Sequence, residues 1–203
     1  MTLGLATTGV VALGLASSPV LVDGLMHNRL LFYGLLFAQL GLVVTLSAAA
    51  QRVSTAVAGA LFFGYAALTG VTFSTLFLVY TASSVAGTFF ITAGAFAGLS
   101  AVGLVTRRDL SAIGRFAIFA LVGVILASIV NLFLQSGGLQ WIITVGGVLL
   151  FAALTAYDTQ RLKAIFQSGA TQANLPIVGA LTLYLDFINM FLFLLRIFGS
   201  RRR

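Results

Sequence analysis

Two aspartates carry most of the chemistry that this sequence could perform. Asp186 lies in the run Leu183–Asn189, about twelve residues into the last apolar stretch, which at about 1.5 Å per residue is near the middle of a bilayer. A charged side chain there costs at least about 2.5 kcal/mol, so Asp186 is expected to face the interior of a protein bundle and to be functional. Asp158 follows Tyr157 at the end of the preceding apolar stretch, where it either serves the same site or pairs with Arg161 as an ordinary helix-end carboxylate.

The combination of these two aspartates predicts a proton-sensitive site. Their stretches are consecutive in the chain, and consecutive elements are usually neighbours in space. Two carboxylates that meet in a low-dielectric environment cannot both ionise cheaply, so Asp158 and Asp186 would share one proton. A shared proton that is lost near physiological pH would make the pair a proton-controlled latch.

Three more residues complete the candidate site. Thr182 and Asn189 stand four residues before and three residues after Asp186, so a helix places all three on one polar stripe. Arg52 lies at a junction between apolar stretches. It could be a counter-charge or a plug for a cation path, or else a basic anchor at the membrane surface. Calcium takes about six to eight oxygen ligands, so Asp158, Asp186 and Asn189 predict only a weak and transient calcium site. Weak binding is what ion conduction requires.

Enzymatic chemistry is not expected of this chain. His27 is the single histidine, cysteine is absent, and no nucleophile elbow, phosphate-binding loop or histidine-rich metal motif occurs. An intramembrane protease with two catalytic aspartates is the one enzymatic alternative, but Asp186 lacks the Gly-Leu-Gly-Asp context of such proteases. We expect no cofactor other than a permeant or weakly bound calcium ion.

Membrane-spanning helices must position these residues. Of the 203 residues, 60% are hydrophobic and 7% are charged, whereas a water-soluble domain carries about 25% charged residues. Stretches that are apolar on every side and about 20 residues long predict transmembrane helices rather than the alternating strands of a barrel. We expect seven such helices in a single transmembrane domain over residues 1–203. The predicted stretches are Thr2–Val22, Leu30–Ala50, Val53–Tyr80, Gly87–Val105, Ala112–Leu134, Leu139–Tyr157 and Leu175–Phe198.

Basic residues set the expected topology, because Lys and Arg of short loops stay in the cytoplasm. Arg52, the segment Arg107–Arg115, and Arg161 with Lys163 follow the second, fourth and sixth stretches. These three loops and the N-terminus are therefore expected to be cytoplasmic. The tail Arg201–Arg203 then lies outside, against the rule, unless the last stretch is re-entrant; seven full crossings are the preferred prediction. The net charge of +7 thus belongs to membrane loops, and nucleic-acid binding is not expected.

Two C-terminal motifs make the chain resemble the Bax inhibitor-1 family, also called the transmembrane Bax inhibitor motif family, and its bacterial branch in particular. They are Ala156–Gln160 and Leu181–Asn189, and Leu194–Gly199 follows the second. The segments Ala67–Thr72 and Arg107–Ser111 fit the family as well, so the resemblance covers nearly the whole chain from the second stretch onward. It implies an all-α integral membrane protein of the bacterial plasma (inner) membrane, a seven-transmembrane-helix bundle with the last helix central. Relatives usually carry a polar segment before the first helix, whereas this chain enters its first apolar stretch at once.

The same resemblance implies a function. Family members form pH-sensitive calcium leaks in which two aspartates, matching Asp158 and Asp186, sense pH together with an arginine that matches Arg52. Calcium ions, protons and the lipid bilayer are then the partners of this chain. One alternative is a membrane-embedded modulator of a membrane protease or quality-control complex, without transport activity. Another is a proton-coupled exchanger that uses the same aspartates.

Overall fold

The structure, a computed structural model, is helical throughout the part of the chain that it describes. It describes residues 1–203 except positions 19, 21, 23, 25, 26, 50, 51, 170–172 and 203, and except the side chains of Arg29, Phe32 and Ala49. Four residues of predicted segments therefore lie outside the described residues: Pro19, Leu21, Ala50 and Arg203. Extended pairing among the described residues is limited to one bridge between Tyr80 and Arg201.

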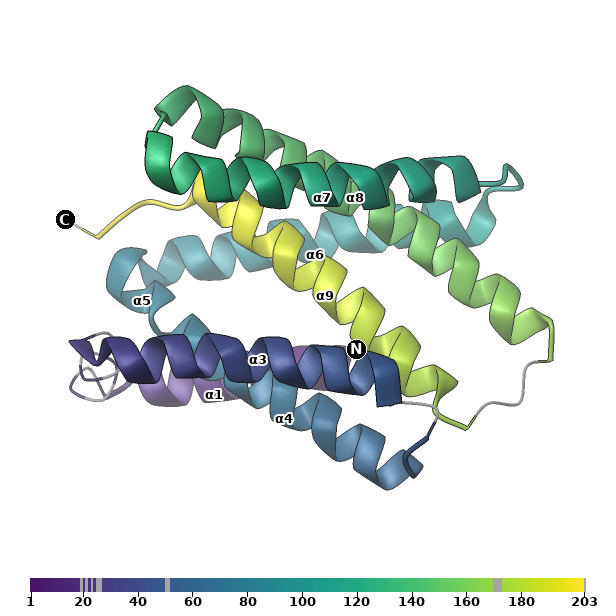
Figure 1. The fold of residues 1–203 in the computed structure, drawn as a ribbon, viewed down its shortest axis with the longest axis horizontal. Helices are drawn as coiled ribbons and strands as arrows, with labels where there is room; N and C mark the ends of the chain where they lie inside the picture. The colour runs from purple at the N-terminus through teal and green to yellow at the C-terminus, as the bar shows by residue number, and fades with distance from the viewer. Residues whose placement is uncertain are drawn as a thin grey trace. The chain divides into compact units, whose positions relative to one another are not determined.

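The helices follow one another along the chain with short connections (Figure 1). Their bounds are α1 Thr2–Ala16, α3 Arg29–Ala49, α4 Thr55–Ser74, α5 Leu76–Val79, α6 Ala82–Val105, α7 Ser111–Leu134, α8 Gly137–Gln167 and α9 Leu175–Phe198. Counting α4 and α5 as one segment, 5 described helices are long and apolar enough to cross a membrane, and two shorter apolar helices lie in α1 and α3. Five and two make the seven segments predicted, and the all-helical membrane bundle is confirmed.

Several helix bounds differ from the sequence prediction. The first stretch was expected to reach Val22, but α1 ends at Ala16. The sixth stretch was expected to end at Tyr157, but α8 continues to Gln167, since polar residues extend a helix readily once it has left the apolar core. The fourth was expected to start at Gly87, but α6 begins at Ala82. The third is interrupted at Thr75, where the side-chain hydroxyl donates to the carbonyl of Thr72 at 2.7 Å and the helix is re-formed as α5.

The chain divides into two compact units, and the first comprises Met1–Ala82, Thr171–Tyr184 and Arg201–Arg203. Here α1 lies directly against α4, because Gly70 has no side chain: a Cβ on it would stand 2.7 Å from the backbone oxygen of Thr8. The α3 helix is joined to α4 by a polar contact, in which the Gln39 side-chain amide donates to the carbonyl of Leu68 at 3.0 Å. The unit therefore rests on close backbone approach and on buried polar bonds, as expected where lipid supplies no hydrophobic drive between helices.

The second unit comprises Ser83–Ala170 and Leu185–Ser200. In it α7 and α8 form an antiparallel hairpin that Figure 1 shows in green. The turn between them places Gln135 in the left-handed region, at φ 48°. Asn131 stabilises this turn, because its side-chain oxygen accepts from Ser136 N at 3.0 Å and its amide nitrogen donates to Gln140 at 3.1 Å.

The last helix, α9, contributes to both units without a break. It belongs to the first unit up to Tyr184 and to the second from Leu185 onward. Half of its most apolar 18-residue window is buried, the largest share among the five long apolar segments, whereas the corresponding share for α7 is 6%. This burial agrees with the expectation that the last helix is the central one.

Candidate functional site

The structure brings Asp158 of α8 and Asp186 of α9 together inside the second unit. Asp158 is 8% exposed and Asp186 is 4% exposed, so both carboxyl groups are withdrawn from the surface of the protein. The two carboxyl groups lie within hydrogen-bonding reach of each other. The prediction that the two side chains meet is consistent with this geometry. The burial of Asp158 argues against a helix-end carboxylate solvated by headgroups, and a pairing of Asp158 with Arg161 stays a prediction.

This arrangement has a direct chemical consequence. Ionised carboxylates only accept hydrogen bonds, so a hydrogen bond between two of them requires a proton on one. The second oxygen of Asp186, Oδ2, is buried and has no hydrogen-bond partner among the described residues. A buried acceptor without a partner is costly, and it marks a place for a proton, a water molecule or a cation.

Two glycines position Asp158 by letting neighbouring helices approach α8. A Cβ on Gly103 of α6 would stand 2.3 Å from the backbone oxygen of Ala156. A Cβ on Gly114 of α7 would stand 2.5 Å from the ring of Tyr157. These contacts lie two residues and one residue before Asp158, so α6 and α7 together fix the rotation of α8 at the candidate site.

Aromatic packing positions Asp186 from the other side. Phe187, the next residue, makes edge-to-face contacts with Phe89 and Phe96 of α6, with ring centroids 5.4 and 5.5 Å apart. Seven residues beyond Asp186, Phe193 stacks at 6.0 Å on Phe151, which lies seven residues before Asp158. From the aspartate pair to the phenylalanine pair, the contact moves toward the C-terminus of α9 and toward the N-terminus of α8. The two helices therefore run antiparallel in this unit, and the two contacting pairs are two helical turns apart.

Few other charges act on the carboxyl pair. Arg161, three residues after Asp158 and exposed, attracts its carboxylate through space. The α6 helix carries no charged residue, and α7 carries only Arg115, near its start. The charged groups that act on the pair are thus Arg161 and the aspartates themselves.

The remaining predicted site residues lie on α9 and in the turn before α4. Thr182 and Asn189 are half-buried, and each bonds its own helix: Thr182 donates to the carbonyl of Val178 at 3.1 Å and Asn189 to that of Leu185 at 2.8 Å. Arg52 is exposed in the turn before α4, in the first unit, whereas the aspartate pair belongs to the second. The role of Arg52 as a counter-charge stays a prediction.

The pair supplies few ligands for a metal ion. Within the described ranges, no three His, Cys, Asp or Glu side chains come close enough together to hold one. Calcium takes about six to eight oxygens, so backbone carbonyls and water would have to add to the two carboxyl groups. Such a donor set fits weak and reversible binding of a hard cation rather than a resident metal.

Sequence reasoning missed three residues that hold the site. Gly103 and Gly114 fix α8, but glycine is frequent in this chain and nothing distinguishes these two from the others before the helices are packed. Gln160 was recognised only as part of a family motif, and the structure shows it bound to the connection between α6 and α7. A polar residue just beyond an apolar stretch was the available signal for Gln160.

The sequence matches, over residues 1–203, the family described as "Inhibitor of apoptosis-promoting Bax1". The chain belongs to the Bax inhibitor-1 family. Inner membrane protein YbhL of Escherichia coli strain K12 is 51% identical over 207 residues, which cover 100% of this chain and 88% of that protein. An uncharacterized protein of Deinococcus radiodurans is 55% identical over 167 residues, covering 81% of this chain and 72% of that protein. An uncharacterized protein of Borreliella burgdorferi is 46% identical over 168 residues, covering 81% and 72%.

This membership agrees with the helical architecture. The chain is a membrane protein of the Bax inhibitor-1 family, with several helices long enough to span a bilayer. The motifs that carry the resemblance, Ala156–Gln160 and Leu181–Asn189, contain the two aspartates and the glutamine described above. The family relationship and the candidate site thus converge on the same two helices, α8 and α9.

Proposed function

We propose that this Bax inhibitor-1 family protein is a pH-sensitive calcium leak of the bacterial inner membrane, gated by Asp158 and Asp186. The single observation that carries the proposal is the proximity of these two buried carboxyl groups. The Oδ2 atom of Asp186 has no hydrogen-bond partner among the described residues. A buried acidic pair in a membrane protein costs stability and is retained for function by default.

The gate works through one proton. At low pH the shared proton lets the two carboxyl groups bond, and α9 stays against α8. When the proton leaves, two adjacent carboxylates repel each other, α9 shifts, and a cation passes beside Asp186. A tenfold difference in proton affinity between the closed and open states is worth about 1.4 kcal/mol, which is enough to change their populations tenfold.

Other predicted residues have subsidiary roles in this proposal. Asn189 uses its amide nitrogen on the carbonyl of Leu185, which leaves its oxygen as the ligand-type atom for a passing cation. Thr182 continues the polar side of α9, and Arg52 is the counter-charge that receives a released carboxylate. The N-terminus and the loop that carries Arg107 and Arg108 lie in the cytoplasm in this scheme.

Calcium influx into liposomes tests the proposal. The purified protein is reconstituted with an enclosed calcium dye, and influx is measured between about pH 5 and 8, a range that brackets an acidic pair in a low-dielectric site. Influx should rise with pH in the parent chain, and Asp158→Asn and Asp186→Asn should each flatten that response. Asp109→Asn is the matched control, because Asp109 is an exposed loop aspartate whose removal should leave the profile unchanged.

Two outcomes would contradict the proposal. If both aspartate variants keep the parent pH profile, the pair is not the sensor. If the parent shows no influx at any pH, the chain does not conduct by itself. The second result would favour the alternative function, a modulator of a membrane protease or quality-control complex, for which the exposed basic loop at Arg107 and Arg108 offers a binding surface.

A further inference from the structure

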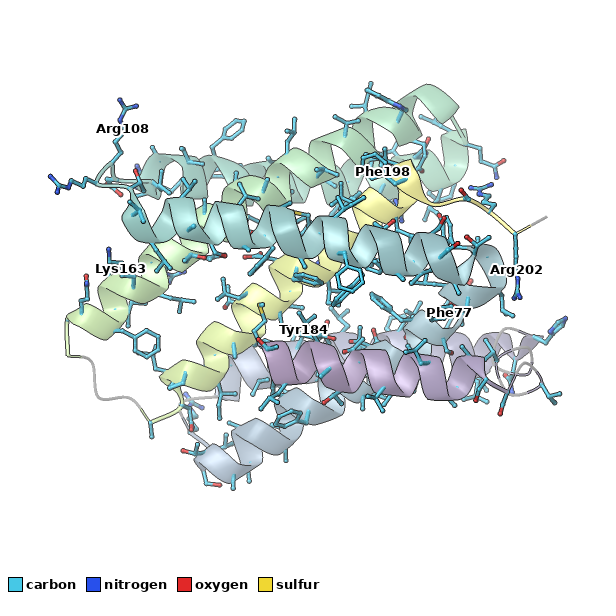
Figure 2. All side chains as sticks on the ribbon, turned by 180° about the vertical axis from the view of Figure 1, so that it is seen from behind. Phe77, Arg108, Lys163, Tyr184, Phe198 and Arg202 are labelled. Carbon is cyan, nitrogen blue, oxygen red and sulfur yellow. The ribbon has the colours of Figure 1, made fainter. Side chains whose placement is uncertain are left out.

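The connection between α6 and α7, residues 106–110, is bound to α8 by a single side chain. The carbonyl oxygen of the Gln160 amide accepts from Leu110 N at 2.9 Å, and its nitrogen donates to the backbone oxygen of Arg108 at 2.9 Å. Both polar ends of one amide are therefore used on one loop, which fixes the loop in position and in orientation. Figure 2 shows Arg108 and Lys163 at this end of the second unit.

Further bonds hold this loop and the end of α6 that precedes it. Lys163 Nζ donates to the backbone oxygen of Leu104 at 2.6 Å, at the end of α6. Thr106 Oγ1 accepts from Arg108 N at 3.3 Å. Asp109 accepts from Ser111 N at 2.8 Å, and these bonds to Ser111 lower the pKa of Asp109, so its carboxylate is charged and occupied within the loop. The loop is thus a fixed support rather than a flexible link.

This support presents a concentrated positive charge. We call the set Arg107, Arg108, Arg115, Arg161 and Lys163 the basic platform. All five belong to the second unit, and four of them are exposed, whereas Lys163 is half-buried. Within the described loop and first turn of α7, Asp109 is the one acid. The platform therefore carries a net positive charge on a rigid backbone, which is the arrangement that binds anionic phosphate groups well.

Exposed apolar side chains border the platform. Val105, the last residue of α6, is 79% exposed, and Phe116 and Phe119 in the first turns of α7 are 74% and 77% exposed. Only 6% of the most apolar window of α7 is buried inside the protein, so most side chains of this helix are open to contact with lipid. A ligand with an anionic head and an apolar tail would find basic side chains for its head and exposed apolar side chains for its tail next to each other.

We propose that the basic platform is a binding site for the headgroup of an anionic phospholipid, whose acyl chains lie along the exposed apolar side of α7. Charge complementarity and the adjoining apolar surface favour a lipid over an acidic protein, because an acidic protein would leave Phe116 and Phe119 unmatched. Gln160 is a positioning residue of this site, since it holds the loop that presents Arg107 and Arg108. The proposal does not depend on ion conduction.

Native mass spectrometry with added lipid tests this site. The detergent-solubilised full chain is titrated with phosphatidylglycerol and, separately, with phosphatidylcholine of the same acyl chains. The parent should retain phosphatidylglycerol preferentially. In the double variant Arg107→Gln/Arg108→Gln, the apparent affinity for phosphatidylglycerol should fall about fivefold for each charge removed. Arg196→Gln is the control for loss of a basic residue elsewhere, because Arg196 lies in the last turn of α9 and its removal should leave the affinity unchanged.

Gln160→Leu separates an organised site from diffuse charge. This variant keeps all five basic residues and loses both bonds to the loop, so phosphatidylglycerol affinity should fall although the net charge is unchanged. Gln160→Met, which also keeps the net charge and loses both bonds, repeats the test if the leucine variant fails to fold, and melting curves report folding for every variant. An unchanged affinity in a folded Gln160 variant would refute the positioning role.

Three results would overturn the lipid assignment. Equal retention of the two lipids would show that the headgroup charge is not recognised. Inorganic phosphate that protects against thermal unfolding as well as phosphatidylglycerol does would show that the acyl chains contribute nothing. Loss of a co-purifying protein in the double arginine variant, with phosphatidylglycerol affinity unchanged, would assign the platform to a protein partner instead.

Discussion

A buried group of hydroxyl side chains joins α9 to α1 and α4 within the first unit. Tyr184 is 0% exposed, and its hydroxyl lies 2.6 Å from Thr8 Oγ1. Thr8 also lies 2.9 Å from the carbonyl oxygen of Ala66, which can only accept. A threonine hydroxyl carries one proton, so when Thr8 gives it to Ala66 it accepts that of Tyr184. The Tyr184 ring, labelled in Figure 2, also makes edge-to-face contacts with Phe62 and Tyr65.

We predict that Tyr184→Phe and Thr8→Val each lower the free energy of unfolding by about 1–2 kcal/mol, because each removes the buried hydrogen bond between the two hydroxyl groups. The double variant should cost little more than either single one, since both remove the same bond. Thr92→Val is the control: Thr92 is also buried, but among the described residues its hydroxyl bonds the carbonyl of Thr88 in its own helix and no other helix. Unfolding in detergent measures all four variants, and additive costs for Thr8 and Tyr184 would show that their bond is unimportant.

At the scale of helices, the glycines of α6 differ in whether another helix lies against them, although they look alike in the sequence. Gly94 and Gly98 have the spacing of a small-residue packing motif, which favours packing inside the chain. The structure differs: among the described residues, nothing lies within 4 Å of a Cβ on either one. Gly103, later in the same helix, is the residue that meets α8. The rotation of α6 about its axis, which spacing does not reveal, determines which glycine makes the contact.

Substitution of these glycines by alanine should separate them. Gly103→Ala places a methyl group 2.3 Å from a backbone oxygen of α8, which cannot yield as a flexible side chain would, so we expect a loss of about 1–3 kcal/mol. Gly98→Ala should be neutral or stabilise by up to about 1 kcal/mol, because alanine is the better helix former. Thermal unfolding in detergent provides the comparison. A stable Gly103→Ala together with a damaged Gly98→Ala would mean that the opposite face of α6 packs inward.

Across the whole molecule, contacts within the second unit bear on the membrane topology. Ser200 N donates to the Ser84 hydroxyl at 2.9 Å, near the start of α6, whereas Arg108 follows the end of that helix. The α6 helix has 24 residues, about 36 Å at 1.5 Å per residue, which exceeds the hydrocarbon thickness of a bilayer. The end of α9 and the basic loop thus lie at opposite ends of a membrane-length helix. This arrangement supports full crossing by the last helix rather than the re-entrant alternative.

Cysteine labelling in intact cells checks this topology, and the chain suits the method because it contains no cysteine. A membrane-impermeant thiol reagent should label Ser200→Cys in intact cells and Arg108→Cys only after the membrane is opened. Arg115→Cys should behave as Arg108→Cys does, because both belong to the basic platform. If Ser200→Cys and Arg108→Cys become accessible together, the last helix does not cross.

The sequence by itself determined the class of the protein, the number of its apolar segments and the two residues of the candidate site. These features depend on local quantities: the length of an apolar stretch against the thickness of a bilayer, and the cost of placing Asp186 inside it. The last helix was predicted at Leu175–Phe198 and is found there, because polar residues bound it on both sides. Arg52 was proposed for the site from its place at a junction between apolar stretches and from the family resemblance, and its role stays a prediction.

Only the tertiary structure decided how these elements meet. The contact of Asp158 with Asp186, the approach of Gly103 and Gly114 to α8, and the Gln160 bond to the loop all depend on the rotation and register of packed helices. A helix that is apolar on every side has no hydrophobic stripe to show which face is inward, so its sequence carries little information about rotation. The continuation of α8 to Gln167 also depends on tertiary contacts. Gln160 and Lys163 in its polar last turns bond to Arg108 and Leu104, which are distant in the chain.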